Sequence, residues 1–271
     1  MKWHAGVRQM KRVLLVTLLS LTFSAAAYSD VTLKQTTSGK GMGMGGDMAG
    51  TTYLKGNKMR TDVVMGGKTR TTIFDVDAQK MYIFESDKKE ADVWDMAAFS
   101  AELSKTVDVS NMQASITPNG QTKEISGHHA TGYDILISVQ SAMGGNTSMM
   151  MTVTLQGPIW MVKDAPGAAE YSRFYKTAAE KGWIFSDPRS ARAQPGEAKA
   201  LAEMYRKVAD IGGIAYESDL QIKISGTGPM AGLLAKMGNM TMTTQITSAE
   251  DSPLADTLFA PPADYKLNPK K

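Results

Sequence analysis

Cysteine is absent from all 271 residues, and histidine occurs only three times. Without cysteine the chain forms no disulfide and lacks the lipid-modified cysteine of a lipoprotein. The motifs G-x-S-x-G and H-E-x-x-H are also missing. The carboxylates fall mostly in predicted hairpin turns, such as Asp75, Asp77 and Asp87, where solvated turn chemistry is their ordinary role. We therefore expect a protein that is not an enzyme and uses no cofactor.

A long hydrophobic run is missing as well. The apolar stretch Val13 to Phe23 has eleven residues, whereas a membrane-spanning helix needs about 20. It follows a basic segment, Lys2 to Arg12, and precedes the small residues Ser24 to Ala27. This three-part pattern is typical of a secretory signal peptide. We predict that residues 1–27 are cleaved after Ala27, that Met10 is an alternative start to Met1, and that the mature protein lies in the periplasm without an integral membrane span.

Charge of one sign is not in excess once that segment is removed. Four of the 30 basic residues lie in residues 1–27, which contain no acidic residue, so 26 basic and 27 acidic residues remain. A near-neutral chain has no electrostatic footprint for DNA or RNA, and we expect no nucleic-acid partner. The remaining 244 residues are enough for one large domain, which we place at 28–268 with a short tail at 269–271.

Alternation of apolar and polar residues is the dominant pattern in that domain. Apolar side chains recur at every second position around residues 31–33, 59–65, 81–84, 149–155, 220–224 and 240–246. Short polar breaks such as Gly56-Asn57 and Gly66-Gly67-Lys68 separate successive runs. Such a pattern predicts a long antiparallel meander with one apolar face and one wet face.

Three helical stripes interrupt the strands. Phe99, Leu103 and Val107 lie one helical turn apart, and further stripes occupy about 168–181 and 197–211. A short helix is also predicted at 230–237, and residues 187–196 read as an exposed linker. The pattern predicts an α+β fold, in which helices, including an insertion at about 168–211, cover the concave apolar face of a strongly curved antiparallel sheet, a half-barrel.

The stretch SGKGMGMGGDMAG, residues 38–50, contains a literal G-x-G-x-x-G. In dinucleotide-binding proteins a helix follows this motif and holds the pyrophosphate, but here another strand pattern follows. We therefore interpret the stretch as a long β-hairpin loop. Its glycines favour mobility, and its methionines make the tip apolar.

Methionine is unusually frequent, with 20 residues, of which 18 follow the predicted signal peptide. Thioethers at M-x-M spacing bind Cu(I), so Met42, Met44 and Met48 form an alternative metal site. Methionine also fills irregular apolar space and suits adaptable binding surfaces. We favour the second interpretation, in which the methionines line a core or a pocket, and expect no metal site.

A succession of short phrases gives the chain a family resemblance. They include Tyr53 to Arg60, Ile73 to Asp77, Lys80 to Phe84 and Ile159 to Asp164, and the chain closes with Leu258 to Lys266. In this order the phrases resemble the LolA/LolB-like superfamily of bacterial envelope proteins. They are most similar to a branch known only as a domain of unknown function. The resemblance covers about Val31 to Leu267.

The resemblance implies a half-open sheet bent around an apolar cavity, with helices as a lid. Lipoprotein carriers of this superfamily take acyl chains into the cavity and have an arginine on an early strand, which matches Arg60. Alternation places either Arg60 or its neighbours Met59 and Val63 toward the cavity. The candidate lining residues are Met59, Arg60, Val63, Ile73, Tyr82, Phe84, Ile135, Met149, Met151, Leu220, Ile222, Met240 and Met242.

This fold implies a binding protein for a lipid or another amphiphile, of carrier or chaperone type. Two alternatives remain. One is a Cu(I)-binding periplasmic protein that uses the methionine loop. The other is a structural envelope component without a ligand, whose sheet contacts an envelope protein as its partner.

Overall fold

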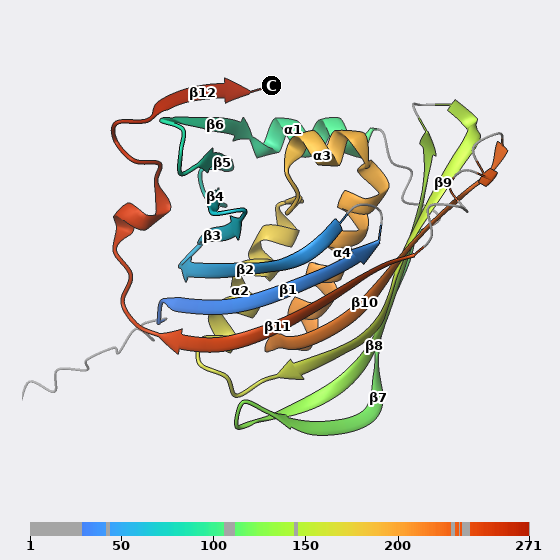
Figure 1. The fold of residues 1–271 in the computed structure, drawn as a ribbon, viewed down its shortest axis with the longest axis horizontal. Coiled ribbons are helices and arrows are strands. Elements are labelled where there is room, and N and C mark those ends of the chain that lie inside the picture. Colours follow the sequence, from blue (N-terminus) through green and yellow to red (C-terminus); the bar gives the residue numbers. More distant parts are fainter. Residues whose placement is uncertain are drawn as a thin grey trace, which may run out of the picture.

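One curved sheet dominates the computed structural model, which describes residues 29–41, 44–105, 112–143, 146–228, 231–232, 234 and 239–270 (Figure 1). For residues 41, 44–46, 65, 141–143 and 146–149 the description covers the backbone alone. The described residues form twelve strands: β1 (Val31–Gly41), β2 (Met44–Lys55), β3 (Lys58–Met65), β4 (Lys68–Asp75), β5 (Lys80–Glu85), β6 (Glu90–Asp95), β7 (Gln113–Ile125), β8 (His128–Met143), β9 (Asn146–Val162), β10 (Ile214–Gly226), β11 (Met240–Asp251) and β12 (Lys266–Lys270).

The strand order shows how two meanders join. Across the sheet the order is β12-β6-β5-β4-β3-β2-β1-β11-β10-β9-β8-β7, so β1 pairs with β2 on one side and with β11 on the other. The pairing is antiparallel except between β12 and β6, which run parallel. The predicted curved, mainly antiparallel sheet is confirmed.

Four helices of the described chain lie within the curve of the sheet (Figure 1): α1 (Met96–Ser104), α2 (Ala168–Glu180), α3 (Pro188–Ala193) and α4 (Pro195–Ile211). The stripes at 168–181 and 197–211 correspond to α2 and α4. The exposed linker predicted at 187–196 is wrong, because Pro188 and Ala191 are buried and Asp187 caps α3 by accepting a hydrogen bond from the Arg189 amide. Val107 and most of 230–237 lie outside the described residues.

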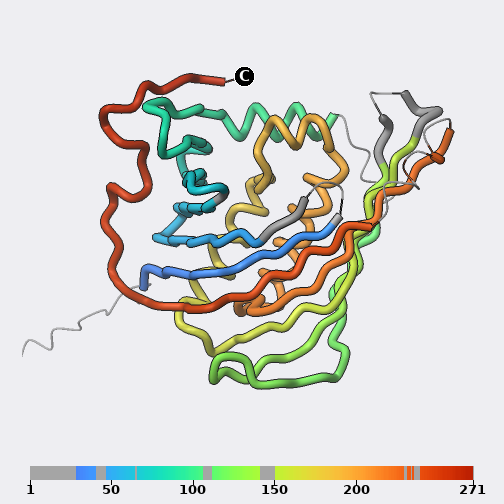
Figure 2. Tube along the Cα trace, viewed as in Figure 1, coloured from blue at the N-terminus to red at the C-terminus, as the bar shows by residue number. Residues whose placement is uncertain are grey.

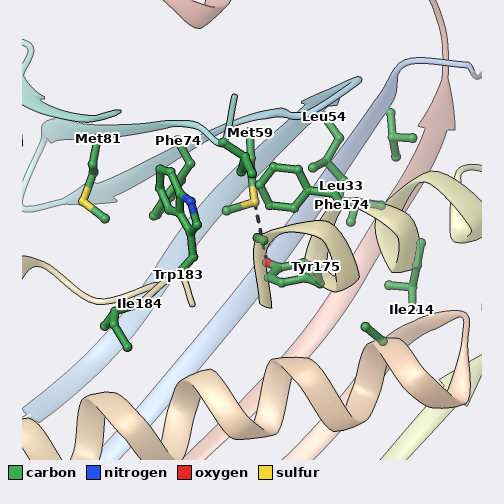
Figure 3. Packing of buried hydrophobic residues seen from close by; sticks show 14 of the residues in the cluster. Leu33, Leu54, Met59, Phe74, Met81, Phe174, Tyr175, Trp183, Ile184 and Ile214 are labelled. Atoms are coloured by element: carbon green, nitrogen blue, oxygen red, sulfur yellow. Dashed lines mark hydrogen bonds between the residues drawn. The ribbon is translucent and has the colours of Figure 1, made fainter. Parts of the chain in front are cut away.

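The concave face is apolar along one continuous row of side chains. Strand register places these residues side by side across six strands: Val31, Leu54, Met59, Phe74, Met81 and Trp94. Phe174 and Tyr175 of α2 pack onto this row, together with Trp183 and Ile184 (Figure 3). Burial of each such side chain contributes about 1.5–3 kcal/mol, so the row fixes α2 against the sheet.

The other half of the concave face is covered by α4. Ala200 and Val208 of α4 belong to one buried cluster with side chains of β8 to β11, and Met204 and Ile211 pack against it. The helices therefore fill much of the space that the curved sheet encloses.

Part of the convex face is buried, although the alternating pattern predicted that this face is exposed to solvent. Ile73 and Phe84 on this face are buried, and so are Phe74 and Ile83 on the concave face of the same strands. The chain after β11 covers this area: Phe259, in the 3-10 helix η2 (Asp256–Phe259), packs against Ile73 and Phe84. Figure 2 shows this segment (red) crossing from β11 to β12. We call residues 252–265 the C-terminal strap.

Residues 1–28 lie outside the described part, so the signal peptide stays a prediction. Among the helices that are described, none has the length and apolar character that a membrane crossing requires.

Candidate functional site

A cavity of about 200 Å³ lies between the sheet and the helices. We call it the inner pocket. Its sheet side comes from β1 to β4, and its helix side comes from α2, α4 and the segment between α2 and α3. The sheet-side lining residues are Gln35, Thr52, Met59, Thr61, Thr72 and Phe74.

The sheet wall of the pocket changes from apolar to polar side chains along the direction of the strands. Met59 and Phe74 pair across β3 and β4 in the apolar row. One step further, Thr52 pairs with Thr61, and Thr61 with Thr72, so three threonines stand side by side. Because neighbouring strands lie about 4.8 Å apart, this threonine row extends over about 10 Å.

The helix wall is aromatic. Tyr171 and Tyr175 come from α2, Tyr205 from α4, and Phe185 from the segment between them. The rings of Tyr175 and Tyr205 stack with centroids 4.6 Å apart and an interplanar angle of 8°, and Phe185 lies 4.9 and 5.1 Å from them. Contacts between rings stabilise such a cluster by about 0.5–1.5 kcal/mol per pair beyond burial, so the rings support one another's positions in the wall.

Several polar groups of the pocket have no partner in the protein. Within the described residues, no group forms a hydrogen bond with the side chains of Thr52, Thr61 or Thr72, and the same holds for the Gln35 amide and the Tyr205 hydroxyl. Thr52 is only 7% exposed. Buried polar groups are normally satisfied by protein, water or ligand. The pocket therefore presents free hydrogen-bonding capacity to whatever enters it.

Tyr175 differs from these groups, because its hydroxyl donates to Sδ of Met59 at 3.6 Å (Figure 3). Burial raises the pKa of Tyr175, Tyr171 and Tyr205 above the ordinary tyrosine value. All three phenols are therefore neutral near pH 7, and they act as hydrogen-bond donors and acceptors rather than as phenolates.

Asp187 is the acidic residue among those that line the pocket. Burial raises the pKa of its carboxyl, but hydrogen bonds and charge from Arg189, with the charge of Arg70, outweigh burial and hold the pKa below the usual value. Arg70 and Arg189 both donate to this carboxylate, Arg189 at 3.0 and 3.1 Å, and Arg189 also contacts Asp92 at 3.3 Å. The carboxylate of Asp187 is thus ionised, and the guanidinium groups of Arg70 and Arg189 balance its negative charge.

Of the predicted lining residues, Met59 lines the inner pocket. Val63 lies on the same face two residues further along β3 and is half-buried. Six others belong to the filled cluster around α4 or pack against it: Ile135, Leu220, Ile222, Met240, Met151 and Met242. Of Met149 only the backbone is described, so its predicted role lies outside the described side chains.

The remaining candidates lie on the opposite face of the sheet. Ile73, Tyr82 and Phe84 contact the C-terminal strap. Arg60 donates from Nε to Asp62 at 2.9 Å and from Nη1 to the Leu258 carbonyl at 3.2 Å. On β3, therefore, Met59 faces the helices and Arg60 faces the strap. The sheet separates Arg60, Ile73, Tyr82 and Phe84 from the inner pocket.

The alternative copper site falls largely outside the description. Met42 and the Met44 side chain are not described, and Met48 is half-buried on β2. No group of three or more His, Asp or Glu residues in the described chain is arranged to hold a metal ion. The Cu(I) site stays a prediction.

Pocket residues that the sequence did not reveal are mainly polar. Thr61 lies between Met59 and Val63 in the alternating pattern, which places it on the inner face, but nothing local pairs it with Thr52 and Thr72. Tyr171 and Tyr205 belong to recognisable helical stripes, but the stripes give no sign that the two helices meet.

Comparisons with known proteins leave the family open. No family model matches the chain, and no curated protein matches it. Similar solved structures include PNGF-II in the C2 and P21 space groups, each at 9% identity over 89% of this chain, with TM-scores of 0.35 and 0.34. This chain spans 31% of the PNGF-II chain. A DUF1329 family protein from Desulfovibrio piger is 8% identical, with 86% and 90% of the two chains covered and a TM-score of 0.33. Likeness at this level assigns neither a family nor a function.

Proposed function

We propose that this chain is an exported periplasmic protein that binds a small hydrophobic or amphiphilic ligand in the inner pocket and catalyses no reaction. The observation that supports this most is the pocket itself, which has an aromatic wall on one side and unpartnered hydrogen-bonding groups on the other. Small-molecule sites pair apolar surface with placed polar groups. Here eight of the eleven lining residues carry a polar side-chain group, which favours an amphiphilic ligand.

The size of the pocket limits its ligand. Pockets for drug-sized ligands are roughly 300–1,000 Å³, and the inner pocket, at about 200 Å³, is smaller. It suits a compact molecule or one end of a longer one. Each buried CH₂ contributes about 0.8 kcal/mol and each hydrogen bond about 0.5–1.5 kcal/mol, so micromolar affinity is within reach.

The resemblance to the LolA/LolB-like superfamily supports the same function, because carriers in that superfamily take hydrophobic chains beneath a curved sheet. The proposed site differs in place from the predicted one. It involves Met59 together with residues of α2 and α4, whereas Arg60 lies outside it.

Native mass spectrometry after gentle purification tests the proposal. We expect a co-purifying small molecule, and uptake of a small fluorescent amphiphile by protein from which that molecule has been extracted. The pocket-filling variant Thr72→Phe should lose both, whereas Thr36→Phe, on an exposed position of β1, should keep them. Absence of any bound molecule together with absence of uptake contradicts the proposal. Cell fractionation tests the periplasmic location.

A structural envelope component without a ligand is the second candidate. It is favoured by the buried cluster around α4, in which apolar side chains of the helix pack directly against β8 to β11. Protein that is consistently empty in native mass spectra, and whose Thr72→Phe variant is as stable as the unchanged protein, would favour this candidate.

A further inference from the structure

The hydrogen-bonding groups of the inner pocket have an ordered arrangement. The threonine row places three hydroxyls on neighbouring strands, and Gln35 on β1 adds an amide one further step along the strands. No described protein group satisfies these side chains, and Thr52 is more than nine-tenths buried. Their spacing of about 4.8 Å suits a ligand with two or more polar groups in a line.

The charges around the pocket disfavour an ionised ligand. The carboxylate of Asp187 repels an anion, and the positive charges of Arg70 and Arg189 are already paired with Asp187 and Asp92. A cation gains little from Asp187, because two guanidinium groups neutralise it. An ion would also lose its hydration without a free counter-charge, which is costly in a buried site.

The aromatic wall complements the threonine row. Tyr175, Tyr205 and Phe185 form a packed aromatic surface on the helix side of the pocket. A flat ring packs well against such a surface, while its hydroxyl groups reach the opposite wall. The two walls together therefore select for a ring that carries polar groups.

Resting on the binding function proposed above, we propose that the ligand is an uncharged ring compound with at least two hydrogen-bonding groups. These groups bind the threonine row, and the ring packs against the aromatic wall. An acyl chain with an ionised carboxylate is then a poor ligand.

Three probes with the same apolar part test this ligand class by calorimetric titration of extracted full-length protein. Hexylresorcinol carries two neutral hydroxyls, the anion of 4-hexylbenzoic acid (hexylbenzoate) carries one carboxylate, and hexylbenzene carries no polar group. We expect hexylresorcinol to bind at least tenfold more tightly than the other two. Equal or tighter binding of hexylbenzoate or hexylbenzene overturns the proposal, and so does failure of all three probes to bind.

Substitution of the row provides the second arm of the test. The double variant Thr61→Val/Thr72→Val keeps the shape and strand propensity of both positions and removes two hydroxyls. It should therefore lower the affinity for hexylresorcinol about tenfold or more. Thr36→Val, outside the pocket, should leave the affinity unchanged. An unaffected double variant overturns the proposal. A co-purifying fatty acid overturns the ligand class while it leaves the binding function standing, so failure of the two proposals is distinguishable.

Discussion

The two buried threonines Thr52 and Thr71 should respond in opposite ways to the same substitution. Both lie within the sheet, and they are 7% and 3% exposed. The Thr71 hydroxyl donates to Oδ1 of Asp62 at 2.7 Å, whereas the Thr52 hydroxyl has no partner in the described protein. Valine has nearly the same shape as threonine, so the substitution tests the hydroxyl alone.

The expected magnitudes follow from the partners. A hydroxyl without a partner costs about 1–3 kcal/mol when it is fully enclosed. The Thr52 hydroxyl opens onto the inner pocket, where water reaches it, so Thr52→Val should stabilise the ligand-free protein by no more than about 1 kcal/mol. A hydrogen bond to a charged group contributes about 1.5–3 kcal/mol. Because Arg60 still holds Asp62 after Thr71→Val, we expect a loss near the lower end, about 1.5 kcal/mol.

Thermal unfolding of ligand-extracted protein, followed by circular dichroism, measures both effects. For a domain of this size, 1 kcal/mol corresponds to about 2–4 °C, so Tm should rise by that amount for Thr52→Val and fall by about 3–6 °C for Thr71→Val. Urea midpoints at an unchanged m-value provide a second measurement. A fall in Tm for Thr52→Val as large as that for Thr71→Val would show that its hydroxyl is satisfied and would refute the reasoning about the pocket.

Other substitutions probe the strap, the ion pair and a tight backbone contact. Phe259→Ala should lower the free energy of unfolding by about 3 kcal/mol and speed hydrogen exchange in β12, while the exposed Leu267→Ala should change it by less than about 0.5 kcal/mol. Asp187 has a lowered pKa, so it stabilises the fold above about pH 4 and loses this contribution as pH falls through its folded pKa. Asp187→Asn should therefore lower Tm at pH 7, with a difference that shrinks in acid; a constant difference would contradict the ion pair. Gly157→Ala should cost about 2 kcal/mol or more by urea unfolding, because Gly157 has a φ of 146° and its added Cβ would lie 2.1 Å from the Asp219 carbonyl oxygen.

Local periodicity predicted the elements of the fold well. Period-two alternation at 59–65 and 81–84 corresponds to β3 and β5, and the stripes at 168–181 and 197–211 correspond to α2 and α4. The burial of Ile73 and Phe84 could not be read from alternation, because Phe259 of the C-terminal strap, which covers them, comes 186 and 175 positions later. The predicted wet face fails there for that reason.

The site was harder to predict than the fold. Alternation places Met59 and Thr61 on one face and Arg60 on the other, but it does not say which face meets the helices. That choice depends on α2, where Phe174 and Tyr175 pack on the Met59 side. The threonine row depends on register across three strands, and the contact between Tyr175 and Tyr205 depends on how two helices pack. Both are tertiary contacts, which local sequence patterns do not predict.

The pairing of β1 with β11 determines when the binding site can exist. Val31 pairs with Asp251, so the joint between the two meanders closes the longest loop of the sheet, and such non-local contacts form slowly. The sheet wall of the pocket belongs to the first meander, whereas its aromatic wall lies in the helices between β9 and β10. A chain synthesised from its N-terminus therefore completes β1 to β6 long before the partner wall is made. A ligand can stabilise only the complete protein, in which both walls of the pocket are present. Until then β1 to β6 have an exposed β1 edge, and they must avoid aggregation without the stabilisation that a ligand provides.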